Sequence, residues 1–292
     1  MPSVVSVNSS VVRPEDALVS VFDRGFLFGD SVYETFRTYD GIPWLEDEHL
    51  VRLGNSADRM GLPLPGGLAR VRDDVARALN ESHEATAAVR IVVTRGAKVG
   101  LIDLDPGTAG TPDVYVLVRP YTPVPEATYR SGIELALVGV RRNARDALDP
   151  AIKSGNYLNN MLALREAKSR GAYECVMLNK DGFLAEGSTS NVFLVKDGVL
   201  ATPALDSGIL AGVTRAYLLG LARAEGIPVR EILLRESDLR AADEVFISGS
   251  LKEVLPVARV DGTPVGAGRP GALTLRLLHA YRSGIAAARR VR

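Results

Sequence analysis

Residues 186–215 read EGSTSNVFLVKDGVLATPALDSGILAGVTR and contain the clearest signals of local structure in the chain. Apolar and β-branched residues lie on both sides of Asp197-Gly198, a pair that favours a tight turn between two strands. A loop then leads into a helix that is predicted over 214–225. Free backbone N–H groups at the start of such a helix can bind an anion such as phosphate, but Thr214 could equally be an ordinary N-cap.

Periodic patterns on both sides of this stretch predict a mixed α/β (α+β) chain. Strands are predicted over 4–12, 31–39, 87–94, 113–119, 132–140, 244–248 and 254–260, and helices over 46–60, 68–79, 156–170 and 272–288. A second Asp-Gly pair, at 181–182, predicts another turn between two short strands. Three prolines in 120–125 predict a linker, because proline fixes φ and cannot donate to a strand ladder. We therefore predict a smaller N-terminal α/β domain over 1–119, a linker over 120–126 and a larger C-terminal α/β domain over 127–292.

The composition excludes several classes of protein. The 292 residues include 35 basic and 35 acidic side chains, so a net charge of zero gives no general attraction to nucleic acid or to an anionic membrane. Cys175 is the only cysteine and the three histidines lack metal-ligand spacing, so no bound metal is expected. The first residues show no signal-peptide pattern, and no stretch approaches the roughly eighteen apolar residues of a membrane span. We expect a soluble, cytoplasmic protein.

A few polar residues could carry chemistry. Lys153 is one of six lysines and lies between a strand-like segment and a helix start, where a partly desolvated amine could act as a Schiff-base nucleophile. A solvated loop lysine is the alternative. Glu186 could hold a proton on a ring nitrogen, or could be a turn acid. Arg52 and Ser250 could contact a phosphate, but an exposed helical arginine and a strand end are the simpler explanations.

Taken in order, these residues resemble the signature of the class IV aminotransferases, the fold-type IV pyridoxal-phosphate enzymes. The segments that carry the resemblance extend over nearly the whole chain: 23–25, 29–30, 33–34, 48–53, 152–157, 186–193, 200–203, 209–215 and 243–246. The resemblance implies the two-domain fold-type IV architecture, with pyridoxal 5'-phosphate at the domain interface, and a homodimeric enzyme. It also implies ping-pong transamination between an amino acid and a 2-oxo acid through an internal aldimine on Lys153.

The same resemblance assigns roles to further residues of this sequence. Glu186 would keep the pyridine nitrogen protonated, Tyr157 would hydrogen-bond the ring oxygen, and Leu210 would pack on one face of the ring. Several segments would together hold the phosphate, through Arg52, Val213, Thr214 and Ser250. A non-catalytic binding module is the alternative from another class, but such a module needs no Schiff-base amine beside a ring-nitrogen carboxylate.

Three branches share this scaffold, and the sequence favours the branched-chain L-amino-acid transaminases. Arg37 and Arg90 match positions that line the substrate side in that branch. Tyr33 instead resembles the D-amino-acid transaminases, the second choice. Those enzymes place an Arg-x-His pair after Val-Thr-Arg-Gly, and this chain lacks the pair, although Lys98 could substitute. An aminodeoxychorismate lyase is the third possibility.

The turn at 250–253 departs from the branched-chain pattern. The usual Thr-Ala-Ala-Glu is Ser-Leu-Lys-Glu in this chain. Leu251 and Lys252 are larger than the alanines that they replace. We therefore expect Leu251 to contact the substrate, and both residues could reshape the pocket for its carboxylate.

Overall fold

The computed structural model describes residues 3–98, 100 and 103–291 and divides the chain into two compact units. The N-terminal unit comprises Met1–Thr122 and Ile152–Asn156, and the C-terminal unit comprises Pro123–Ala151 and Tyr157–Arg292. The predicted domain boundaries stay a prediction. The prediction did, however, place 152–156 inside the C-terminal domain, whereas the structure groups this segment with the N-terminal unit.

Backbone hydrogen bonds explain why this short segment belongs to the N-terminal unit. The Tyr33 N–H donates to the Lys153 carbonyl at 3.0 Å, and the Gly155 N–H donates to the Ser31 carbonyl at 2.8 Å. The segment therefore pairs with the beginning of the strand at 31–39, although the two are more than one hundred residues apart in the sequence.

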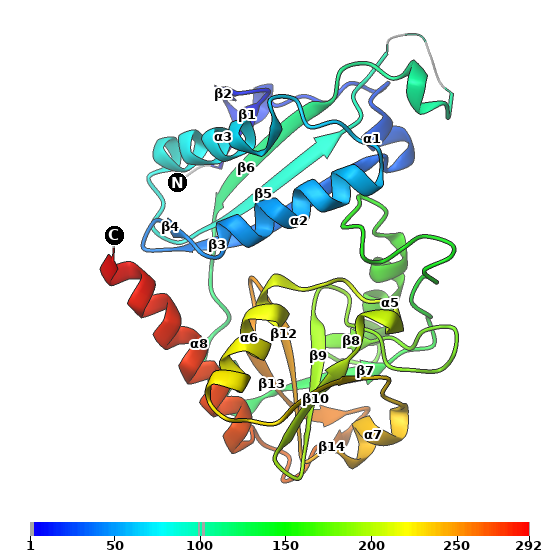
Figure 1. Ribbon diagram of the computed structural model, residues 1–292, viewed down its shortest axis with the longest axis vertical. Helices are drawn as coiled ribbons and strands as arrows, with labels where there is room; N and C mark the ends of the chain where they lie inside the picture. Colours follow the sequence, from blue (N-terminus) through cyan, green and yellow to red (C-terminus); the bar gives the residue numbers. More distant parts are fainter. Residues whose placement is uncertain (1–2, 99, 101–102, 292) are drawn as a thin grey trace. The chain divides into compact units, whose positions relative to one another are not determined.

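The N-terminal unit is built on a six-stranded antiparallel sheet in the order β2-β1-β6-β5-β3-β4. The strands are β1 (Val4–Val7), β2 (Ser10–Val12), β3 (Ser31–Tyr39), β4 (Ile42–Pro43), β5 (Ala87–Thr94) and β6 (Asp113–Pro120), and the helices are α1 (Arg24–Phe28), α2 (Glu46–Arg59) and α3 (Gly67–Ser82). Helices α2 and α3 cover one face of the sheet (Figure 1). The apolar side chains of α2 recur at helical spacing, and Leu50, Leu53 and Ala57 are at most 1% exposed because they face the sheet.

Strand β3 directs alternate side chains to opposite faces of this sheet. Glu34 and Phe36 point toward α2, where both contact His49. Tyr33 and Arg37 therefore point to the other face. This alternation separates two groups of polar side chains that are adjacent in sequence.

The C-terminal unit is built on a mixed eight-stranded sheet in the order β11-β10-β9-β12-β13-β7-β8, with β14 paired to β13. The strands are β7 (Ile133–Leu137), β8 (Glu174–Val176), β9 (Asn191–Lys196), β10 (Val199–Pro203), β11 (Val229–Ile232), β12 (Glu244–Gly249), β13 (Glu253–Val260) and β14 (Thr263–Pro264), and the helices are α4 (Glu126–Ser131), α5 (Leu158–Ser169), α6 (Val213–Ala224), α7 (Glu236–Ala241) and α8 (Ala272–Val291). Helices α6 and α8 pack on each other and on β12, and α5 packs on β7 and β8.

The mixed α/β composition is as predicted, and three local predictions are wrong. Residues 4–12 form the hairpin β1–β2 instead of one strand, because Asn8 and Ser9 have positive φ and reverse the chain. The turn at 181–182 is flanked, among the described residues, by an isolated bridge between Leu178 and Leu184 and not by two strands. The short helices α1, α4 and α7 were not predicted. In the described part of the chain, no helix has both the length and the apolar composition that crossing a membrane requires.

Candidate active site

Lys153 lies against Tyr33 in the N-terminal unit. Its backbone N–H donates to Ser56 Oγ of α2 at 3.1 Å, which helps to fix the direction in which the side chain leaves. The amine Nζ lies 3.4 Å from the Tyr33 hydroxyl oxygen and 4.5 Å from the centre of the Tyr33 ring. The lysine that the sequence singled out is thus beside a residue predicted to bind the substrate.

Arg90 reaches the same ring from β5. Its guanidinium carbon lies 4.1 Å from the centre of the Tyr33 ring, and in the sheet Arg90 pairs with Thr35. The side chain is exposed, so an anion arriving from solvent can reach it. Tyr33, Arg90 and Lys153 together bring a phenol, a guanidinium and an amine into one place, which we call the Tyr33 cluster.

Arg37 points to the same face of β3 as Tyr33 but has different surroundings. Its guanidinium carbon lies 4.1 Å from the ring centre of Tyr39 and 4.8 Å from that of Tyr121. Arg37 is 5% exposed, whereas Arg90 is exposed. Of these two arginines, Arg90 is therefore the better placed to meet a substrate from solvent.

Arg52 is held by a buried carboxylate. Its Nε donates to Glu34 Oε1 at 2.7 Å and its Nη2 donates to Glu34 Oε2 at 2.9 Å, a bidentate pair. The Nδ1 of His49 lies 2.7 Å from Glu34 Oε2. The guanidinium plane of Arg52 therefore has a fixed orientation on α2.

The charges of this Glu34–His49–Arg52 cluster follow from its burial. Burial raises the pKa of Glu34, but the charge of Arg52 and the hydrogen bonds from Arg52 and His49 outweigh it and lower the pKa to about 2. Burial lowers the pKa of His49. The ring is therefore neutral at pH 7, with the Nδ1 proton donated to Glu34. The positive charge of Lys153 also contributes to the lowered pKa of His49, so the amine lies within electrostatic range of the cluster.

Glu186 is a buried carboxylate of the C-terminal unit. Its Oε1 accepts from Arg142 Nε at 2.8 Å, and its Oε2 accepts from the Leu210 N–H at 2.9 Å. Arg142 is itself oriented by a bond from its Nη1 to Asn159 Oδ1 at 3.0 Å. The carboxylate is 5% exposed and is held by donors from two separate segments.

Helix α6 presents its first backbone N–H groups without a capping side chain. Its N-cap is Gly212, so the alternative prediction that Thr214 is the N-cap is wrong. A side chain at Gly212 would collide with Asn191 Oδ1, which explains the glycine. Uncapped N–H groups and the helix dipole make the start of α6, at Val213 and Thr214, a favourable place for an anion.

The turn at 249–252 carries Ser250 and Leu251 at its two central positions. It is closed by a hydrogen bond from the Lys252 N–H to the Gly249 carbonyl at 2.9 Å. The Lys252 amine is held by a carboxylate, since its Nζ donates at 2.6 Å to Glu174 Oε2. Ser250 and Leu251 are half-buried.

The family model described as amino-transferase class IV matches residues 31–260, most of the chain. The chain is a class IV aminotransferase.

The relatives of this class IV aminotransferase fall into two groups of differing specificity. A protein of Methanocaldococcus jannaschii assigned as a branched-chain-amino-acid aminotransferase is 39% identical over 95% of both chains. The D-alanine aminotransferase of Listeria monocytogenes is 37% identical over 95% of this chain and 94% of its own.

Solved structures confirm the fold-type IV fold class. The branched-chain amino acid aminotransferase of Escherichia coli is 32% identical and superposes with a TM-score of 0.92, covering 97% of this chain and 94% of its own. A second branched-chain amino acid aminotransferase, from T.th. and solved with pyridoxamine 5'-phosphate, is 29% identical and has a TM-score of 0.93, covering 98% and 94%.

The predicted site residues of this class IV aminotransferase lie in both units. The N-terminal unit contains Tyr33, Arg37, Arg52, Arg90 and Lys153, and the C-terminal unit contains Tyr157, Glu186, Leu210, Val213, Thr214, Ser250 and Leu251. Tyr157 is half-buried at the N-cap of α5. Lys98 adjoins residues 99 and 101–102, which lie outside the described residues.

Sequence reasoning missed the partners of these residues. Glu34 and His49 lie within the quoted motifs, and the spacing of three between His49 and Arg52 places both on one side of a helix, so a signal was present. Arg142 and Glu174 had no such signal. Arg142 lies 44 residues from the carboxylate that it binds, and nothing local marks it.

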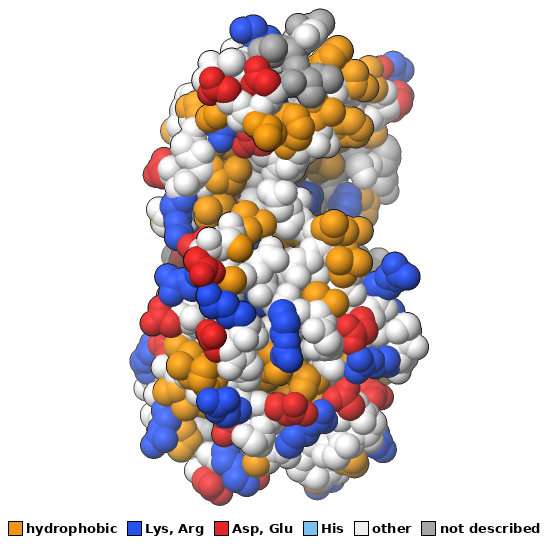
Figure 2. All heavy atoms as spheres, turned by 90° about the vertical axis from the view of Figure 1, so that its right-hand side faces the viewer, with side chains coloured by type: hydrophobic (Ala, Val, Ile, Leu, Met, Phe, Trp, Pro, Cys, Tyr) orange, Lys and Arg blue, Asp and Glu red, His pale blue; other side chains and the backbone are white. Residues whose placement is uncertain are grey.

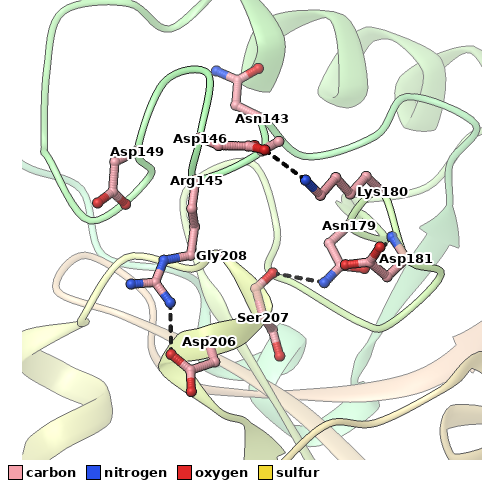
Figure 3. Close-up of a pocket in the computed structure, with 11 residues that line it drawn as sticks. Asn143, Arg145, Asp146, Asp149, Asn179, Lys180, Asp181, Asp206, Ser207 and Gly208 are labelled. Atoms are coloured by element: carbon pink, nitrogen blue, oxygen red, sulfur yellow. Dashed lines mark hydrogen bonds and ion pairs between the residues drawn. The ribbon is translucent and has the colours of Figure 1, made fainter.

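The C-terminal unit also has a cavity of about 410 Å³, shown in Figure 3. Its described lining residues, which include none of the predicted site residues, are Asn143–Asp146, Asp149, Asn179–Asp181 and Asp206–Gly208. The charges pair with one another, Arg145 with Asp206 at 2.7 Å and Lys180 with Asp146 at 2.9 Å. Both ion pairs are exposed and add little stability.

Proposed function

We propose that this class IV aminotransferase transfers the amino group of a branched-chain L-amino acid to a 2-oxo acid, with Lys153 as the catalytic base. The observation that carries the proposal is the Tyr33 cluster. It combines an amine 3.4 Å from a phenol with an exposed guanidinium on the same ring. A base for the α-proton and a cation for the carboxylate are the two groups that an α-amino acid needs side by side.

Pyridoxal 5'-phosphate is the cofactor of class IV aminotransferases, as predicted. When bound, it acts as an electron sink for the substrate carbon that loses its proton, and it carries the amino group between the two half-reactions.

The described residues fit this cofactor. The uncapped start of α6 suits a phosphate, and Ser248 Oγ near the 249–252 turn is buried with no hydrogen-bond partner among the described residues. Glu186 is a buried carboxylate that has the capacity to accept a further proton donor, such as a pyridinium N–H. Lys153 supplies the amine that would hold the cofactor covalently, and Arg52 a planar cation for its phosphate.

The remaining steps belong to the side chains of the Tyr33 cluster. As the catalytic base, the Lys153 Nζ would take the proton from the substrate α-carbon and later release it. The Tyr33 hydroxyl, 3.4 Å from that nitrogen, orients the amine. Arg90 binds the α-carboxylate and so fixes which face of the α-carbon meets Lys153.

A D-amino acid is the second candidate substrate. The Listeria D-alanine aminotransferase is nearly as similar to this chain as the Methanocaldococcus relative is. The position of Tyr33 beside Lys153 also suits this alternative, because a phenol there can donate to a carboxylate.

We also propose that the enzyme is a homodimer. Large apolar side chains are exposed on both units, among them Leu18 (77%), Phe26 (68%) and Leu104 (74%) of the first and Leu158 (66%) and Met161 (63%) of the second. Figure 2 shows one face of the molecule, on which apolar side chains lie among charged side chains of both signs. Large apolar side chains that are exposed in one chain are stabilised when a second subunit covers them. Sedimentation equilibrium should give twice the chain mass of 31.2 kDa.

An absorbance scan of the cofactor-loaded enzyme tests the substrate. Bleaching of the visible band by L-leucine, and not by D-alanine, is the expected result; the reverse would favour the second candidate.

Lys153→Ala should lose both the covalently bound cofactor band and turnover. Arg90→Ala should raise KM for L-leucine more than it lowers kcat, and an unchanged KM would contradict the role given to Arg90.

A further inference from the structure

Lys252, the residue that departs furthest from the branched-chain pattern, closes a polar network inside the C-terminal unit. Its Nζ donates to Glu174 Oε2 and to Thr189 Oγ1, both at 2.6 Å. The side chain of Lys252 is 18% exposed and that of Glu174 is 1% exposed. The amine therefore neutralises a carboxylate that solvent does not reach.

The other contacts of Glu174 come from the loop that begins at Glu186 and from the next residue of β8, Cys175. Its Oε1 accepts from the Ser188 N–H at 3.1 Å and from the Cys175 N–H at 2.9 Å, and the Ser190 hydroxyl lies 3.4 Å from its Oε2. Burial raises the pKa of Glu174, but the charge of Lys252 and these hydrogen bonds outweigh it and lower the pKa to about 2. The carboxylate is ionised, and it depends on both the loop and the lysine.

The network joins two segments that have separate tasks. The 186–191 loop is also held by Asn160, whose Nδ2 donates to the Ser188 carbonyl at 2.8 Å, and by Asn191, whose Nδ2 donates to the Leu210 carbonyl at 3.1 Å. The 249–252 turn is also held by the Tyr129 hydroxyl, which donates to the Lys252 carbonyl at 3.1 Å. The Lys252 amine therefore links the turn to the loop in two ways. It donates a hydrogen bond directly to Thr189 of the loop, and it forms an ion pair with Glu174 of β8, which in turn accepts from the Ser188 N–H.

We propose that Glu174 and Lys252 are positioning residues, which fix the 249–252 turn against the 186–191 loop and so set the distance between Ser250 and Glu186. The inference rests on the proposed function for the roles of these two residues, phosphate contact and ring-nitrogen contact. A flexible lysine stem loses rotamer freedom when both its ends are held, and the two short hydrogen bonds offset that cost.

Hydrogen–deuterium exchange of the cofactor-free protein tests the link itself. Lys252→Met keeps the apolar stem and removes the charge, so exchange should quicken in both 187–191 and 249–253. Lys196→Met is the matched control, because Lys196 also binds a carboxylate, that of Asp243 at 2.8 Å, but at an exposed site of the same unit. This control should leave both segments unchanged.

Cofactor binding tests the consequence for the site. Lys252→Met should weaken the binding of pyridoxal 5'-phosphate to the apoenzyme roughly tenfold and raise KM for the 2-oxo acid, while kcat at saturating cofactor stays within about threefold of wild type. Glu174→Gln should change the same two constants in the same direction. Lys252→Arg, which keeps the charge, should restore most of the affinity.

The outcomes separate this inference from the proposed function. Faster exchange confined to 249–253, or unchanged cofactor affinity in Lys252→Met, would overturn the positioning role. Failure of Lys252→Arg to restore more affinity than Lys252→Met would do the same, because charge would then be irrelevant. Wild-type protein that binds no pyridoxal 5'-phosphate would refute the proposed function, and linked exchange in both segments would still establish the ionic link.

Discussion

Each unit buries a carboxylate whose pKa is lowered to about 2, and the two are held in different ways. Glu34 depends mainly on two side chains of one helix, because its donors are Arg52, His49 and a long bond from the Thr35 N–H at 3.3 Å. Glu174 has one cation, and two backbone N–H groups within 3.1 Å share its charge.

This difference shows how far each carboxylate depends on its cation. Without Arg52, Glu34 would keep a neutral imidazole and one weak backbone donor. Without Lys252, Glu174 would keep two good backbone donors. Loss of the cation should therefore cost more stability in the N-terminal unit than in the C-terminal unit.

The largest effect is expected from Arg52→Met in the cofactor-free protein. The substitution leaves Glu34 buried without a counter-ion, which costs about 3–5 kcal/mol of unfolding free energy. Trp44 is the only tryptophan and belongs to the N-terminal unit, so its fluorescence in a urea titration reports the loss there. A loss below about 1 kcal/mol would mean that His49 suffices to hold Glu34.

Lys252→Met should cost less, about 2 kcal/mol, because the amides of Cys175 and Ser188 still solvate Glu174. Hydrogen–deuterium exchange rates of the backbone amides of β8 and β9 measure this loss of unfolding free energy in the C-terminal unit. A loss equal to that of Arg52→Met would show that the backbone donors contribute nothing to the stability of the ionised Glu174.

The pH dependence of the unfolding free energy tests how strongly Arg52 stabilises the ionised Glu34. A folded-state pKa of about 2 against 4.5 for an ordinary glutamate means that Glu34 contributes its full stability above about pH 5 and loses it as the pH falls toward 2. His49, whose pKa is lowered by burial, acts in the same direction below its ordinary value of 6.5. From pH 7 to pH 4, Glu34 alone should account for a loss of about 1 kcal/mol in the wild type. Urea midpoints followed at Trp44 should decline less steeply in Arg52→Met.

The smallest effect is expected at the exposed pair of Lys196 and Asp243. Water already solvates both charges, so Lys196→Met should leave the urea midpoint unchanged within error. A measurable shift would show that ionic contacts in this protein contribute to stability regardless of burial.

Regular elements could be predicted from the sequence because their signals are local. The strands at 31–39 and 87–94 begin and end where alternation predicts, and α2 ends within a residue of its prediction. The hairpin at Asn8-Ser9 was missed because neither residue is the glycine that a left-handed turn usually contains.

Candidate site residues followed from motifs, whereas their partners did not. Lys153 and Glu186 were selected because each lies in a motif that is formed with adjacent residues, at 152–157 and 186–193. Lys252 was noticed as an exception, but its partner Glu174 lies 78 residues away on β8, and no periodicity connects the two. Ion pairs of this kind depend on the order of the strands in the sheet, which the sequence pattern does not predict.

The short segment Ile152–Asn156 has a consequence for how the protein is made. The chain passes between the units after Thr122, after Ala151 and after Asn156, and residues 123–151 of the C-terminal unit are synthesised before the lysine segment emerges. During synthesis the first residues of β3 therefore remain unpaired on one side, because the segment that pairs with them has not yet been translated. Expression of residues 1–122 alone would leave this edge of β3 unpaired, so the first unit is completed only after part of the second has been synthesised.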